Sequence, residues 1–201
     1  MKDLSKRSLQ IGFILEVLIV IYSYFEANGN LTPFFQTSAR LSGRVSLLFF
    51  AILLIYHTLQ PNCNEKEIID VKYTLSKNFA IIHIIHWFFL AFSVYLTQFD
   101  LVPLRVAGGA FAYFIIILLP LAIKGKILKR MALSKIFNFY LFYVWLIFFM
   151  TYVTRLTNEN AGFTGSKTSY IALITFTIFL MLWRVFILIK KVKNEKTGIT
   201  R

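Results

Sequence analysis

Cysteine is almost absent from this chain, which has one, Cys63, among its 201 residues. A single thiol excludes an internal disulfide and any zinc or iron–sulfur site built from several cysteines. Acidic residues are also scarce, because nine Asp and Glu stand against 22 Lys and Arg, and only 15% of the residues are charged. A soluble domain has about a quarter of its residues charged. This shortage indicates a membrane protein.

Sequence motifs for nucleotides and for zinc-dependent hydrolysis are missing as well. The chain has no G-x-x-x-x-G-K-[ST] loop and no H-E-x-x-H, and GGAFAY at residues 108–113 is not a G-x-G-x-x-G fingerprint. Any module that binds NAD(P)H or flavin would therefore have to be a separate protein.

Long apolar runs account for most of the sequence, which is 58% hydrophobic with a mean hydropathy of +0.68. A helix that spans a bilayer needs about 20 mostly apolar residues. We predict an all-α integral membrane protein, a single domain over residues 1–201 that forms a bundle of six transmembrane helices. The six runs are Ser8–Glu26, Ser38–Leu59, Asn78–Thr97, Pro103–Ile123, Ile136–Leu156 and Ser169–Ile189.

Lys and Arg are shared unequally between the two sides of this predicted topology. Sixteen lie in the two tails and in the second and fourth loops, whereas five lie on the other side and Arg184 falls inside the last run. Basic residues near helix ends mark the cytoplasmic side, so both termini are predicted to be cytoplasmic. The net charge of +13 then reflects topology and affinity for anionic lipid, and we expect no nucleic-acid binding.

Histidine is the rare residue that carries the functional hypothesis. His83 and His86 are three apart in the third run and so share a helix face, and His57 closes the second run. A polar ring in hydrocarbon costs several kcal/mol without a partner, so these rings should point inward. Two histidines on facing helices could ligate a haem, and three could hold copper, iron or zinc. Alternatively, they bond to hydroxyl groups or backbone carbonyls. The predicted topology places all three, with Glu16, in the inner leaflet.

Three other charged residues lie within or beside the apolar runs. Glu16 could pair with a histidine, belong to a proton relay, or form a structural hydrogen bond, because ionisable groups in a membrane are functional candidates. Arg40 and Arg44 are spaced i,i+4 on the other side. They could hold an anionic quinone, a lipid or a haem propionate, or anchor the helix at the headgroups.

Four stretches between residues 38 and 156 resemble the ferric reductase-like transmembrane domain family, which includes the haem-binding membrane subunit of periplasmic methionine sulfoxide reductase. They are ARLSGRVSLLFFAILLIYHT, LSKNFAIIHIIHWFFLAFSVYL with its H-x-x-H, RVAGGAFAYFIIILLPLAIKG and FYVWLIFFMTYVTRL. The resemblance implies a six-helix bundle in a bacterial inner membrane that passes electrons across this membrane through b-type haem. The donor would be quinol or a separate flavoprotein or other redox partner.

One departure from the family pattern concerns the fifth helix, where members carry haem-ligating histidines. The corresponding region, KIFNFYLFYVWLIFFMTYV, has none, and Phe137 or Asn138 stands where the first would be. Either His57 replaces that ligand, opposite His83 or His86, or the chain has lost haem. The expected function is electron transfer by an oxidoreductase subunit. The alternatives are a non-catalytic subunit or scaffold of the same fold, and a small proton-coupled transporter.

Overall fold

A computed structural model describes residues 2–60, 65–98, 103–125, 130–157 and 166–196, and these form six helices with no strand. The helices are α1 (Lys2–Ala27), α2 (Leu31–Leu59), α3 (Lys66–Thr97), α4 (Pro103–Lys124), α5 (Arg130–Thr157) and α6 (Lys167–Lys196). All six contain a stretch that is long and apolar enough to cross a membrane. The predicted number of helices is therefore confirmed.

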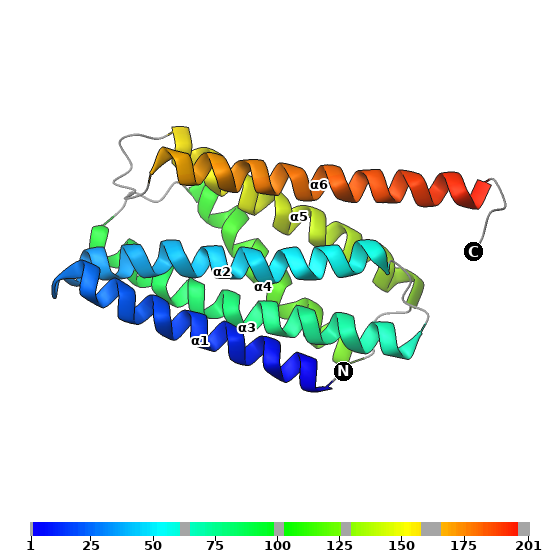
Figure 1. Ribbon diagram of the computed structural model, residues 1–201, viewed down its shortest axis with the longest axis horizontal. Helices are drawn as coiled ribbons and strands as arrows, with labels where there is room; N and C mark the ends of the chain where they lie inside the picture. Colours follow the sequence, from blue (N-terminus) through cyan, green and yellow to red (C-terminus); the bar gives the residue numbers. More distant parts are fainter. Residues whose placement is uncertain (1, 61–64, 99–102, 126–129, 158–165, 197–201) are drawn as a thin grey trace.

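The helices run back and forth along one elongated bundle (Figure 1). α1 begins and α6 ends at the same end of the bundle, where α2 ends and α3 begins. We call this the basic end, because it is the side to which most Lys and Arg were assigned from the sequence. The N-cap of α2 is formed by Asn30, whose Oδ1 accepts from the backbone N–H of Thr32 at the opposite end.

α2 lies at the centre of the packing, against α1, α3 and α6, and its most extensive contact is with α3. The main apolar core contains side chains from α2, α3, α4, α5 and α6. Its fully buried members include Phe50, Phe79, Phe137 and Leu141. α1 packs on the outside of α2 and α3 through a smaller cluster of Ile19, Val45 and Ile82. The polar residues discussed below lie inside this α2-centred packing.

The outside of the bundle is unusually apolar. Phe25 is 72% exposed, Phe179 62% and Leu182 64%, and many other large aliphatic and aromatic side chains face outward. Soluble monomers rarely expose continuous apolar surface of this kind. A hydrocarbon solvent explains it, so the surface agrees with a multi-pass membrane protein.

Several helices are longer than their predicted bounds. α3 begins at Lys66 rather than Asn78, and α5 begins at Arg130 rather than Ile136. Hydropathy finds only the apolar part of a helix, whereas charged and polar residues continue the same hydrogen-bonded ladder beyond it. The longer α3 places His83 almost five turns from the start of the helix, of which the first three turns are the charged and polar segment before Asn78.

Candidate functional site

A cavity of about 230 Å³ lies between α2, α3, α4 and α5. We call it the central cavity. Its polar lining includes two histidines and two arginines, and the rest is apolar or aromatic. The lining residues are Arg40, Gly43, His83, His86, Leu90, Gly109, Ala112, Tyr113, Ile116, Val144, Ile147, Phe148, Thr151, Tyr152 and Arg155. Both histidines of the lining, His83 and His86, were predicted as site residues. Because both line the cavity, the H-x-x-H of α3 points inward.

His83 is held firmly on one side of this cavity. Its Nδ1 lies 2.6 Å from the Oγ of Ser46, which is near the midpoint of α2. Its ring stacks on Tyr113 of α4, with centroids 4.5 Å apart, and contacts the rings of Phe79 and Phe148. A hydrogen bond and three aromatic contacts fix the orientation of this imidazole, as the structural alternative expected.

His86 faces the cavity beside His83, with ring centroids 5.5 Å apart. Its ring hydrogen-bonds to the backbone of Ala39, while its buried Nδ1 has no partner. The ring lies directly over Gly43, since a Cβ at that position would be 3.0 Å from the His86 Cε1. Gly43 thus makes room for the imidazole against α2.

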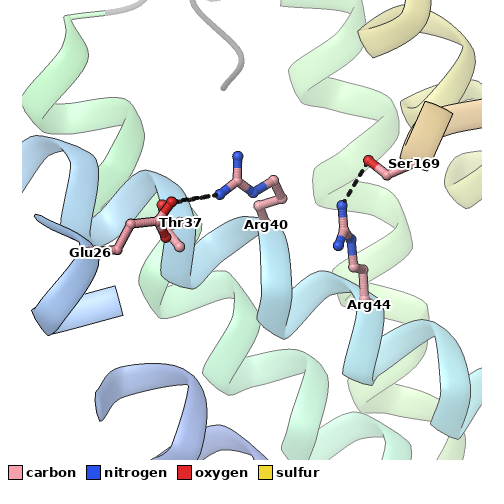
Figure 2. Close-up of polar contacts among 5 residues, drawn as sticks. All are labelled: Glu26, Thr37, Arg40, Arg44 and Ser169. Carbon is pink, nitrogen blue, oxygen red and sulfur yellow. Dashed lines mark hydrogen bonds and ion pairs between the residues drawn. The ribbon is translucent and has the colours of Figure 1, made fainter. Parts of the chain in front are cut away.

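The two predicted arginines point to different places (Figure 2). Arg40 Nη2 donates to Thr37 Oγ1 at 3.2 Å and lies 3.9 Å from Glu26 Oε1 of α1. Arg44 Nη2 donates to Ser169 Oγ of α6 at 3.1 Å.

The side chain of Arg40 is only 15% exposed, and it also lines the central cavity. Arg44 instead lines an apolar groove between α1 and α2. Only one of the two therefore belongs to the cavity, and neither lies simply on the surface.

His57 is not brought together with the other histidines. It lies eleven residues beyond Ser46 on α2, roughly 16 Å along the helix, and its Nε2 is 3.2 Å from Asn138 Oδ1 of α5. Its ring stacks on Phe137, with centroids 5.1 Å apart. Phe137 and Asn138, one of which stands at the position of a histidine expected from the resemblance, thus both contact His57.

These positions do not fit a bis-histidine haem. Such a haem needs an imidazole on each side of the iron. His83 and His86 come from the same helix, so a macrocycle between them would run into the α3 backbone. Across the cavity, α5 offers Phe148, Thr151 and Tyr152 rather than a histidine. Among the described residues there is also no group of three or more His, Cys, Asp or Glu placed to hold a metal ion.

Glu16 is buried between α1 and α2, with 4% of its surface exposed. Ser42 Oγ donates to its Oε1 at 2.9 Å, and its Oε2 has no hydrogen-bond partner. Ser42 and Ser46, the partner of His83, lie one turn apart on α2. The carboxyl therefore lies beside the His83 side of the bundle, but its direct partner is a serine and not a histidine.

Two residues of the cavity were missed in the sequence. Tyr113 lies within the apolar fourth run, where a single tyrosine gives no signal. Arg155 falls within the predicted run Ile136–Leu156 but was counted only as a basic residue of the non-cytoplasmic side, whereas α5 brings this arginine to the cavity. An arginine inside a helical run was the signal that could have identified it.

Comparisons with known proteins add no relative: no family model, curated protein or solved structure matches this chain.

Proposed function

We propose that this chain is a membrane-embedded redox subunit that binds the ring of a quinone or quinol in the central cavity. The observation that carries the proposal is the unpartnered Nδ1 of His86, which faces a cavity that also contains arginine side chains. The proposed setting is a bacterial inner membrane, with both termini in the cytoplasm. The proposal keeps the electron-transfer role expected from the ferric reductase-like resemblance and assigns no step to haem.

The size of the cavity supports a single substituted ring. An apolar cavity of about 150 Å³ in a protein can hold benzene. The central cavity, at about 230 Å³, has room for one ring with its oxygen atoms and small substituents. A haem macrocycle of four pyrrole rings is far larger.

The polar groups match the two oxygens of such a ring. Because a neutral imidazole has one N–H, and His86 uses one nitrogen on the Ala39 backbone, its Nδ1 is available as an acceptor. A quinol hydroxyl can donate to it. The guanidinium groups of Arg40 and Arg155 have only donors, which suit a quinone carbonyl or a quinolate oxygen.

The surrounding side chains would position the ring. Tyr113 and Phe148 offer aromatic surfaces for offset stacking, and both already pack against His83. With a quinol bound, His86 Nδ1 would accept one hydroxyl proton, and the arginines would stabilise the negative oxygen of the quinolate that this leaves. The electrons would pass to or from a separate redox partner, since the sequence has no nucleotide motif.

Equilibrium binding of a short-chain ubiquinol and its quinone to detergent-purified protein tests this proposal. We expect saturable binding by the wild type and a loss of about tenfold or more in affinity for His86→Leu, because one hydrogen bond to the ligand is removed. His57→Gln is the matched control, since that buried histidine lies far along α2. Equal binding by the two variants, or no saturable binding by the wild type, would overturn the proposal.

A further inference from the structure

A second group of polar side chains lies at the basic end and takes no part in the central cavity. It consists of His57 of α2, Lys72 of α3, Asn138 of α5 and Arg184 of α6, and we call it the basic-end cluster. Arg184 Nη2 donates to Asn138 Oδ1 at 2.6 Å, and the same oxygen is 3.2 Å from His57 Nε2. The Lys72 Nζ lies 5.7 Å from the centroid of Phe137, the ring on which His57 stacks. Four helices therefore meet around these side chains.

The cationic members of this cluster are deeply buried. Lys72 is 0% exposed and Arg184 6%, and His57 between them is 1% exposed. Lys72, Arg184 and Lys191 are all close enough to act electrostatically on His57. A buried guanidinium such as that of Arg184 is unfavourable unless hydrogen bonds and an opposite charge compensate it.

Hydrogen bonding in the cluster is incomplete as well. Arg184 Nη1 and His57 Nδ1 are buried and have no hydrogen-bond partner. The one acceptor that His57 and Arg184 share is the neutral carbonyl oxygen of Asn138. An unpartnered guanidinium nitrogen on a side chain that is more than nine-tenths buried indicates that an acceptor with negative charge belongs there.

We propose that the basic-end cluster binds a phosphate group. Phosphate offers several charged oxygens, which suit the forked geometry of a guanidinium and a nearby ammonium. Asn138, which accepts from Arg184, is itself exposed, so the cluster lies one side chain below the surface of the bundle. The group could be the headgroup of an anionic lipid or a free phosphate, because both present the same oxygens.

The position along α6 agrees with a ligand at the membrane interface. Arg184 lies six residues before Lys190, roughly 9 Å along the helix, and the charged residues begin there. Lys191 Nζ donates to the carbonyls of Thr58 and Leu59 at 3.1 and 2.7 Å, which fixes the end of α2 beside His57. When α6 spans the bilayer, we expect the phosphates of a lipid leaflet near Lys190, and the long side chain of Arg184 bridges much of the distance to them.

Thermal unfolding of the detergent-purified full chain tests the proposal, with inorganic phosphate and dihexanoyl phosphatidylglycerol as the two probes. Sodium chloride at equal ionic strength and dihexanoylglycerol, which has no phosphate, are the controls. At a hundredfold excess over the dissociation constant, we expect the midpoint to rise by about 5 °C or more with a phosphate probe and not with the controls. A rise with both probes identifies the phosphate group as sufficient, and a rise with the lipid alone identifies a headgroup site.

Two variants connect the effect to the cluster. Arg184→Gln should raise the apparent dissociation constant of the phosphate probe about 10- to 100-fold, because a charge-assisted hydrogen bond is lost. Lys190 is exposed on the same helix, so Lys190→Gln should respond like the wild type. Asn138→Asp places a carboxylate inside the cluster. This variant should unfold at a higher temperature without any probe and lose the response to phosphate. The absence of a saturable rise in the wild type, or equal responses of the Arg184 and Lys190 variants, overturns the proposal.

Discussion

Asn138 is the residue whose removal best tests the packing at the basic end. Its Oδ1 accepts from Arg184 Nη2 at 2.6 Å and lies within hydrogen-bond distance of His57 Nε2 at 3.2 Å. Asn138→Ala therefore leaves two buried groups without their shared acceptor. A hydrogen bond to a charged group contributes about 1.5–3 kcal/mol and a neutral one about 0.5–1.5 kcal/mol. Because Asn138 itself is exposed, we take the lower end of both ranges and expect the free energy of unfolding to fall by about 2 kcal/mol in total.

This loss is large enough to measure as a change in melting temperature. For a chain of this size, 1 kcal/mol shifts the midpoint by roughly 2–4 °C, so Asn138→Ala should melt about 4–8 °C below the wild type. Circular dichroism of detergent-purified protein follows the helices directly. The control is Thr157→Ala, because this exposed residue of α5 bonds only to the backbone of its own helix. If Asn138→Ala and Thr157→Ala melt at the same temperature, the shared acceptor contributes nothing and the reasoning is refuted.

Three further predictions concern the central cavity and its neighbours. Gly43→Ala should weaken quinol binding about tenfold and cost about 1–3 kcal/mol in unfolding experiments, because the new Cβ would press on the His86 ring at 3.0 Å; normal affinity would show that the ring position is unimportant. Gly109→Leu should abolish quinol binding in the same assay, because the residue lines the cavity and the new side chain would fill part of it. The melting temperature should not fall, since a Cβ at this position meets nothing within 4 Å. Retained affinity would place the ligand elsewhere. Ser42→Ala should cost about 1–3 kcal/mol by removing the donor to the buried Glu16 carboxyl, as measured by chemical unfolding in detergent micelles; a neutral result would mean that water replaces the serine.

The sequence was sufficient to predict the membrane helices, because a run of about 20 apolar residues has few other uses. It was insufficient for their ends. The segment before Asn78 contains Lys66, Glu67 and Asp70, so it has no apolar signal, yet it forms the first turns of α3.

Partners of the rare polar residues could not be predicted, because they depend on helix packing. The H-x-x-H pattern correctly indicated that His83 and His86 face inward. That His83 meets Ser46, 37 residues away, and His57 meets Asn138, 81 residues away, follows from which helices are neighbours. A single sequence carries no direct record of such neighbours. The distance between His57 and the other two histidines could not be predicted for this reason, since adjacent helices can place their histidines at different levels of the bundle.

The most direct test of the quinone proposal is the ratio of quinone to protein after purification from native membranes. Wild type, His86→Leu and His57→Gln should be purified in parallel, extracted with organic solvent and quantified by chromatography. We predict close to one quinone per chain in the wild type and in His57→Gln, and a loss of most of it in His86→Leu. Equal amounts in all three proteins, or none in the wild type, would contradict a quinone site at His86.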